Sequence, residues 1–238
     1  MLHARPGGRR TRLAVRPALA SWERPSHPDQ VKLKRSLEHV TELAQPAMDQ
    51  DGPLALELFV GLTEGRLLTH DRDLDNYLYP VLNRLGHARF AAAFGSKRRQ
   101  DDSTIAVGPT TPIAPRRSPD LVVSPTGTYE KREWILQIER ACAHASPLDP
   151  YGNGPIRLVI AYDLGPSRNW TSLWKPTIDG LGPLLGTVIR PKKIHDDPRD
   201  GRITDLEFHQ TVDPGRRHDL HVHFWWDIAP GRTTPAAL

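Results

Sequence analysis

Cysteine is almost absent from this sequence: Cys142 is the only one among 238 residues. A single thiol excludes an internal disulfide and any zinc site built from cysteines. Because Cys142 lies in the apolar pattern WILQIERACA, we expect it to be a small buried residue. Long apolar runs are absent too, and none approaches the 18 residues that a membrane-spanning helix needs. The N-terminus lacks the apolar core of a signal peptide, so we expect a cytoplasmic protein.

Apolar residues make up only 38% of the chain, while prolines and glycines number 23 and 18. This composition predicts a core of limited size, many turns and few long helices. The formal net charge of +4 mildly favours a polyanionic partner. The first residues, MLHARPGGRRTRLAVRP, are basic, and we expect a flexible arm over residues 1–24. A plain disordered tail and an arm that touches nucleic acid are both consistent with this segment.

One pattern of elements occurs twice. A helical segment precedes a Gly-Pro turn, an apolar β-type run follows the turn, and a second helical segment comes next. The repeated runs are GPLALELFVGL and GPIRLVIAYDL. The three segments of the first copy are 29–46, 52–62 and 76–86, and those of the second are 129–147, 154–164 and 172–182.

Further matches support the repeat. Pro80 aligns with Pro176, and each second helix ends in Leu-Gly, at residues 85–86 and 181–182. About fourteen residues later each copy carries an acidic pair, Asp101-Asp102 or Asp196-Asp197, before another β-type run. We interpret the chain as a tandem duplication whose copies pack as a pseudo-dimer, because one small unit cannot bury its own sheet. The alternative is two unrelated segments with a similar order of elements.

This interpretation divides the chain into five parts. After the basic arm come a first copy, a linker, a second copy and a disordered tail. Their residue ranges are 1–24, 25–108, 109–120, 121–229 and 230–238.

The stretch DRDLDNYLYPVLNRLG, residues 71–86, places Asp71, Asp73 and Asp75 at the start of an amphipathic helix. An aspartate at a helix N-terminus can cap free backbone N–H groups and interacts well with the helix dipole. Three neighbouring carboxylates also repel one another, and a bound cation would relieve that repulsion. The segment alone leaves both explanations open.

These acidic segments resemble the RusA-type Holliday-junction resolvases, a family of small homodimeric endonucleases. The family signature is Asp-x-Asp-Asn at the start of a helix, a lysine four residues after the second aspartate, and Asp-Asp before a strand. Asp73-Leu74-Asp75-Asn76 matches the first part, and Asp101-Asp102-Ser103 matches the last. The resemblance covers roughly residues 25–108 and again 120–225. It implies an α+β fold with a mixed β-sheet, helices on one side, and two lobes paired as in a dimer.

The two copies depart from the family in opposite ways. In the first copy the lysine position is Tyr79, while the carboxylates are kept. In the second copy the lysine is kept as Lys175, but the acidic positions read Asn169-Trp170-Thr171-Ser172. The resemblance therefore implies a fused dimer with at most one active site, in the first copy.

The resemblance also implies the chemistry of that site. Magnesium would be held by Asp73, Asp75 and Asp102, with Asp101 as a further catalytic candidate, and would activate water and clamp the scissile phosphate. Because Tyr79 cannot supply a positive charge, Arg72 or the run Lys97-Arg98-Arg99 would have to do so, although that run also fits a solvated loop. The expected DNA-binding residues are Arg72, Lys97, Arg98, Arg99, Lys175, Arg190, Lys192 and Lys193.

We therefore expect a magnesium-dependent endonuclease that acts on branched or structured DNA, as a monomer or a homodimer. The kept carboxylates favour this function. The missing lysine and the degenerate second copy favour an alternative, a catalytically inactive DNA-binding protein of the same fold. A function unrelated to nucleic acid is also compatible with the modest charge.

Overall fold

The computed structural model describes residues 1–20, 23–63, 69, 72–145, 154–188, 197–217 and 219–228. No helix in these ranges is long and apolar enough to cross a membrane. The α-helices are α1 (Pro28–Met48), α2 (Leu74–Leu85), α3 (Arg132–Ala145), α4 (Trp174–Asp179) and α5 (Gly182–Leu185), and the 3-10 helices are η1 (His87–Arg89), η2 (Trp170–Leu173), η3 (Asp200–Arg202) and η4 (Pro214–Arg216). The strands are β1 (Leu2–His3), β2 (Thr11–Arg12), β3 (Leu54–Leu62), β4 (Phe90–Arg99), β5 (Thr104–Pro109), β6 (Pro112–Ile113), β7 (Leu121–Val123), β8 (Ile156–Leu164), β9 (Thr187–Val188), β10 (Asp197–Pro198), β11 (Ile203–Val212) and β12 (Leu220–Ile228).

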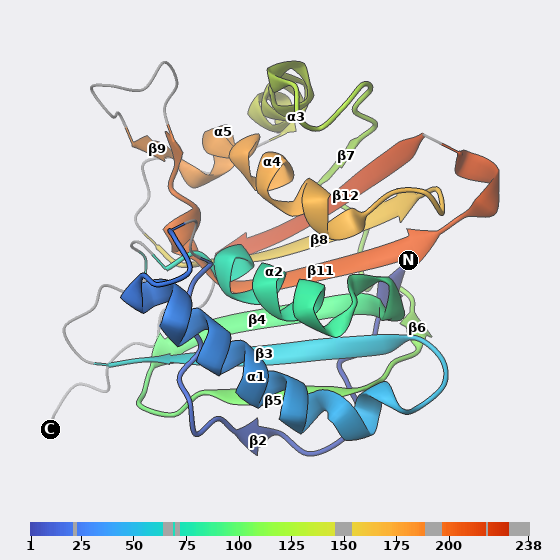
Figure 1. The fold of residues 1–238 in the computed structure, drawn as a ribbon. Coiled ribbons are helices and arrows are strands. Elements are labelled where there is room, and N and C mark those ends of the chain that lie inside the picture. Colours follow the sequence, from blue (N-terminus) through green and yellow to red (C-terminus); the bar gives the residue numbers. More distant parts are fainter. Residues whose placement is uncertain are drawn as a thin grey trace, which may run out of the picture.

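An eight-stranded mixed sheet, in the order β2-β5-β3-β4-β11-β8-β12-β7, forms the centre of the fold (Figure 1). The two apolar runs recognised in the sequence form β3 and β8. Both strands are buried along most of their length, as expected where side chains are covered on both faces of a sheet. The expected α+β fold with a mixed sheet is thereby confirmed.

The central strands β4 and β11 run antiparallel to each other, and the pairings outward from them follow the same sequence on both sides. β3 lies parallel to β4, and β8 lies parallel to β11. The next strands outward, β5 and β12, are antiparallel to their neighbours. The register of the central pair is centred on Phe94 opposite Glu207. Each parallel pair has a bulge directly after its first residue pair, so β3 and β8 occupy corresponding positions.

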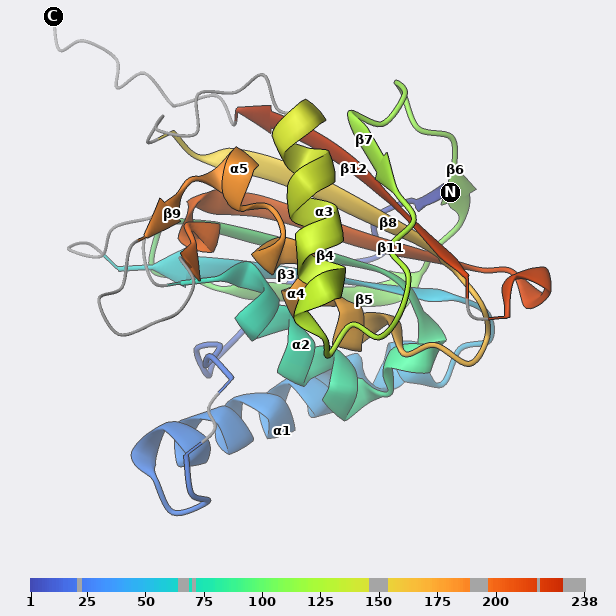
Figure 2. The ribbon, with the colours of Figure 1, turned by 90° about the horizontal axis from the view of Figure 1, so that it is seen from above.

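The helices cover one face of this sheet (Figure 1), and α1 lies to one side of the strands when the molecule is seen from above (Figure 2). The predicted apolar stripe of α2 is confirmed, because Leu74, Leu78 and Leu82 are buried in the main core. From the second half, Trp174 stacks on Phe208 with ring centroids 4.0 Å apart. Cys142 is fully buried, as expected.

In the second half, the structure differs from the continuous helix expected over 172–182. This segment is divided into η2, α4 and α5. Gly180 ends α4 where the chain packs tightly on α3, since a Cβ at this position would lie 2.7 Å from the Cβ of Ile138. A side chain there would clash, so the close approach to α3 requires glycine.

The basic N-terminal segment is packed against the sheet, which differs from the flexible arm expected over residues 1–24. Strand β1 pairs with β6, and β2 pairs with β5. Arg5 and Arg10 donate hydrogen bonds to Glu57, and Arg5 also donates to Glu207. Both glutamates are buried on the face opposite the helices, where an unpaired carboxylate would be costly. Arg5 and Arg10 therefore have a structural role.

The alignment of the two acidic pairs is wrong. Asp101-Asp102 lies in the turn between β4 and β5, whereas Asp197 lies in β10, ahead of η3 and β11. Asp196 falls outside the described residues. The connection from α5 to β11 in the second half is longer than the connection from α2 to β4 in the first half. The two acidic pairs therefore follow their helices at a similar distance in the sequence, although they lie at different places in the fold. By strand order, the turn at 100–103 corresponds to the segment 213–219.

Candidate active site

Asp73 occupies the N-cap position of α2, but its side chain makes no capping hydrogen bond to the helix backbone. Its carboxylate instead accepts a hydrogen bond of 3.2 Å from the side-chain amide of Asn76. A capping aspartate is recognised by the bond it accepts from the second or third backbone N–H of the helix. Helix capping therefore does not account for Asp73.

Asp75 lies in the first turn of α2 with only 4% of its surface exposed. Burial raises the pKa of Asp73 to about 7, and the negative charges of Asp200 and Asp75 add to this shift. Burial likewise raises the pKa of Asp75 to about 6, although the positive charge of Lys175 opposes the shift. Both carboxyl groups consequently change their protonation state near neutral pH.

Lys175 lies in α4, in the second half of the chain, and its ammonium group contacts this acidic region. Its Nζ is 2.7 Å from Asp200 Oδ2 and 2.9 Å from Asp179 Oδ1. Burial alone would lower the pKa of Lys175, but the charges of Asp200, Asp75 and Asp179 raise it. From the sequence, Lys175 was expected to bind DNA as part of the second copy, apart from the metal site of the first. The structure places it beside the carboxylates of α2.

Lys97 is the other cation of this region, and its side chain is completely buried. Its Nζ donates hydrogen bonds of 2.7 Å to the backbone oxygens of Arg72 and Gly201. Burial lowers its pKa to about 8, against the attraction of Asp73 and Asp200. Because Arg72 precedes Asp73 and Gly201 follows Asp200, Lys97 fixes the two acidic segments relative to each other.

These side chains form what we call the acid–lysine cluster. They come from α2, β4, α4 and η3, on both sides of the central strand pair, and α2 and α4 lie over the same face of the sheet (Figure 1). Four carboxyl groups face two lysines, so an added cation would relieve the remaining repulsion. The members of the cluster are Asp73, Asp75, Lys97, Lys175, Asp179 and Asp200.

The oxygen ligands of the cluster are of the type that magnesium prefers. Among the residues that the structure describes, no three acidic, histidine or cysteine side chains are grouped so as to hold a metal ion. Magnesium commonly uses one or two carboxylates and completes its coordination with water and substrate phosphate. Asp73 and Asp75 are two carboxylates of this kind, and the charge of Asp75 contributes to the raised pKa of Asp73.

Asp101 and Asp102 lie elsewhere. Asp102 forms an ion pair with Arg12 and is 44% exposed, and Asp101 lies 3.9 Å from Arg16 and is 84% exposed. Neither is among the charges that shift the pKa of Asp73 or Asp75. The turn packs on the end of β3, where a Cβ on Gly61 would meet the Asp102 backbone oxygen at 2.3 Å.

The remaining basic candidates have varied surroundings. Arg98 forms an ion pair of 2.6 Å with Asp205 across the central strand pair. Arg99 is exposed at the end of β4, and Arg72 is half-buried beside Asp73. The predicted DNA contacts at Arg190, Lys192 and Lys193 lie outside the described residues.

Sequence reasoning missed Asp179 and Asp200 and placed Lys175 in a different site. A signal for Lys175 was present, because the resemblance matched its acidic positions in the first half and its lysine in the second. Only the antiparallel pairing of β4 with β11 shows that these positions lie close together. Asp200 had no comparable signal, since it lies in the charged stretch KIHDDPRDGR with two other aspartates.

Comparisons of the chain with known family models, curated proteins and solved structures find no match.

Proposed function

We propose that this chain is a magnesium-dependent endonuclease for branched or structured DNA, with a single active site at the acid–lysine cluster. The observation that carries the proposal is the meeting of Asp73 and Asp75 from one half with Lys175 from the other. Two crowded, buried carboxyl groups with raised pKa values are typical of functional sites. The RusA-type signature supplies the same residue types, two aspartates and a lysine.

We infer further that the two halves arose by duplication and form a fused pseudo-dimer. This inference rests on the common strand directions, the repeated bulge and the central register. It explains why Lys175 can replace the lysine that is Tyr79 in the first half. Equivalent helices that run antiparallel across a twofold axis bring the start of one near the end of the other.

The bound metal would supply an activated water and stabilise charge on the scissile phosphate. Asp73 and Asp75 would hold it. The side chain of Lys175 is 49% exposed, so its ammonium group would be within reach of a substrate phosphate in addition to Asp179 and Asp200. Lys97 is fully buried, so its role is to keep the two acidic segments at a fixed separation.

A second candidate function is DNA binding without cleavage. The ion pair between Asp102 and Arg12 favours it, because Asp102 is the third metal ligand that the resemblance implies. In that case the cluster would be a remnant that still contributes to the junction of the two halves.

The deciding experiment incubates the protein with labelled four-way junction and linear duplex DNA, with and without Mg²⁺. We expect nicking of the junction only with Mg²⁺, and a loss of at least 100-fold on Asp75→Asn substitution. Asp51→Asn, an exposed aspartate before β3, is the matched control and should cleave like the wild type.

Equal cleavage by the Asp75→Asn and wild-type proteins would show that the nuclease activity belongs to another site or to a contaminant. Metal-independent binding of the junction without any product would favour the second candidate function.

A further inference from the structure

Residues 1–12, which we call the strap, cross the face of the sheet opposite the helices and contact both β3 and β11. Their backbone pairings are short, since β1 and β2 have two residues each. The strap also lies close to β5, because a Cβ on Gly108 would be 2.4 Å from the backbone oxygen of Gly7. A segment with so few backbone pairings depends on its side-chain contacts to stay on the sheet.

One of these contacts joins the strap backbone to an imidazole of the sheet. The backbone N–H of His3 donates a hydrogen bond of 3.1 Å to Nδ1 of His209, in β11. The two histidines are only 7% and 1% exposed, and their rings stack with centroids 6.2 Å apart. Phe94 of β4 packs edge-on against His209. The bound strap therefore keeps both imidazoles away from solvent.

This hydrogen bond determines the protonation state of His209. Because a backbone N–H only donates, Nδ1 is unprotonated and the proton of the neutral ring lies on Nε2. Nε2 is 3.7 Å from Glu207 Oε2, and it has no hydrogen-bond partner among the residues that the structure describes. A second proton would bind at Nδ1 and would remove the acceptor of the His3 N–H group.

Charged groups of several elements face the two rings. Arg5 joins Glu57 to Glu207, and Arg157 donates a further hydrogen bond of 2.9 Å to Glu207. These groups are Arg5 of the strap, Glu57 of β3, Arg157 and Asp163 of β8, Glu207 of β11, and the amino group of Met1, which pairs with Asp163.

Both imidazoles resist protonation while the strap is bound. Burial lowers the pKa of His209, although the charge of Glu207 opposes this shift. Burial also lowers the pKa of His3 to about 4, and the neighbouring His209 adds to the effect. The attached strap is consequently the state with fewer bound protons.

We propose that His3 and His209 form an acid-sensitive contact that releases the strap from the sheet while the rest of the fold stays intact. Release exposes both rings to water, where an imidazole takes up a proton near pH 6.5. As the pH falls from about 6.5 towards 4, each histidine therefore favours release by up to about tenfold per pH unit. Above pH 7 the strap stays bound. The proposal does not depend on the function proposed for the acid–lysine cluster.

The test measures the mobility of a nitroxide on the strap by electron paramagnetic resonance. The label is attached through Arg9→Cys, at an exposed position, and Cys142 does not compete because it is buried. The ratio of mobile to immobile label should rise at least tenfold from pH 7 to pH 5, because the released strap binds more protons. The circular dichroism spectrum, recorded on the same samples, should stay unchanged.

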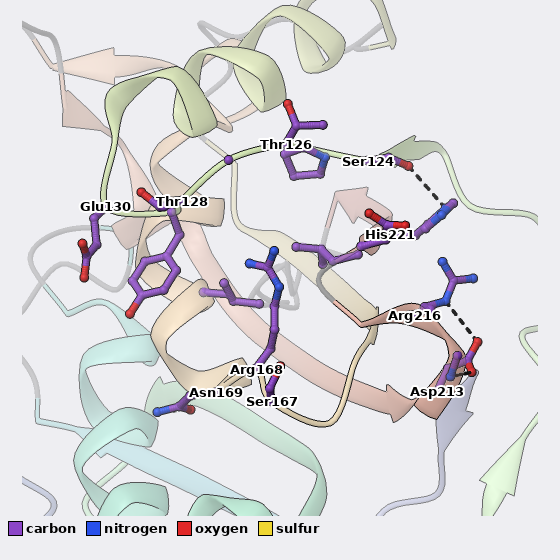
Figure 3. A pocket seen from close by; sticks show the side chains of 17 residues that line it. Ser124, Thr126, Thr128, Glu130, Ser167, Arg168, Asn169, Asp213, Arg216 and His221 are labelled. Atoms are coloured by element: carbon purple, nitrogen blue, oxygen red, sulfur yellow. Dashed lines mark hydrogen bonds and ion pairs between the residues drawn. The ribbon is translucent and has the colours of Figure 1, made fainter.

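Two substitutions examine the histidines separately. His209→Asn supplies a side-chain oxygen near the position of Nδ1 without a titrating group, so the strap should stay bound at pH 5. His3→Phe keeps the stacked ring but removes one protonation site, so the dependence of release on pH should be about half as steep. His221→Asn is the matched control and should behave like the wild type. His221 lies on a separate cavity of about 1090 Å³, with its Nδ1 3.3 Å from Ser124 Oγ (Figure 3).

A label that stays immobile until circular dichroism shows loss of the fold would overturn the proposal. Release in both His209→Asn and His3→Phe at the same pH and with the same steepness as in the wild type would also overturn it. If His209→Asn already frees the strap at pH 7, the His3→Phe protein decides. A reduced steepness in that variant supports a titrating contact, and an unchanged steepness refutes it.

Discussion

At the start of η2, Asn169 accepts a hydrogen bond of 3.0 Å from the backbone N–H of Thr171. At the corresponding start of α2, Asp73 accepts no such bond from the helix. Both Asp75 and Thr171 are buried, but only the hydroxyl of Thr171 has neutral side-chain partners, Asn83 and Asn169. The second half has uncharged groups that satisfy one another, while the first half keeps carboxyl groups that burial makes costly.

The same contrast is found in the central strands of the sheet beneath these helices. Lys97 in β4 and Gln210 in β11 both reach backbone oxygens across the central strand pair, at Gly201 and Phe90 respectively. The first contact uses a buried charge and the second a neutral amide. A buried charge is less favourable for stability than a neutral group that makes an equivalent hydrogen bond. One end of the sheet thus satisfies its buried polar groups with neutral partners, whereas the other end keeps buried charges.

The largest expected effect is on the rate of junction cleavage, and it distinguishes a substitution at Lys175 from one at Tyr79, the aligned residue of the first half. Lys175→Ala should lower junction cleavage by about 100-fold, because it removes the positive charge beside four carboxyl groups. Tyr79→Phe should change cleavage less than twofold. Single-turnover cleavage rates measure both. Equal rates for Lys175→Ala and wild type would mean that the meeting of the two halves has no catalytic role.

The pH dependence should be the next largest effect. Metal binding requires ionised carboxylates, and the pKa values of Asp73 and Asp75 are about 7 and about 6. Cleavage should therefore fall at least tenfold from pH 7 to pH 6 and level off above pH 8. A higher Mg²⁺ concentration should move the profile to lower pH, because the metal competes with protons. If the pH profile of cleavage does not change with Mg²⁺ concentration, the titrating group is not a carboxylate that binds the metal.

A stability measurement sharpens the comparison. The pKa of Asp75 is about 6 in the folded protein and about 3.8 in the unfolded chain, so the folded state binds the proton more tightly. Ionisation of Asp75 thus costs stability as the pH rises from about 4 to 6, by about 3 kcal/mol once complete. Asp75→Asn should raise the melting temperature by about 5 °C or more at pH 8. The gain should disappear near pH 4. A lower melting temperature for the variant at pH 8 would contradict the inference that ionised Asp75 destabilises the folded protein.

The smallest effect concerns the caps themselves. Asn169→Ala removes an observed capping bond and should destabilise the protein by about 1 kcal/mol, whereas Asp73→Ala removes none and should not destabilise it. Urea unfolding at pH 7 measures both free energies. Equal losses for the two variants would show that Asp73 does cap its helix in solution.

Much of this architecture was accessible from the sequence because it depends on local patterns. The apolar runs of β3 and β8 and the stripe of α2 have clear periodicity, and these predictions are confirmed. The packed N-terminal segment was missed because its pairing with β5 and β6 and its ion pairs with Glu57 and Glu207 are non-local. The position of Lys175 beside Asp75 and the participation of Asp200 were missed for the same reason, since both depend on the pairing of β4 with β11.

The pairing of β4 with β11 within one chain has a consequence for how the cluster responds to dilution. A site divided between two separate chains is lost when the protein concentration falls below the dissociation constant of the dimer. Here the covalent connection keeps Lys175 at a high effective concentration near Asp75, whatever the amount of protein present. The acid–lysine cluster consequently stays assembled in a single molecule, with no encounter required between two copies.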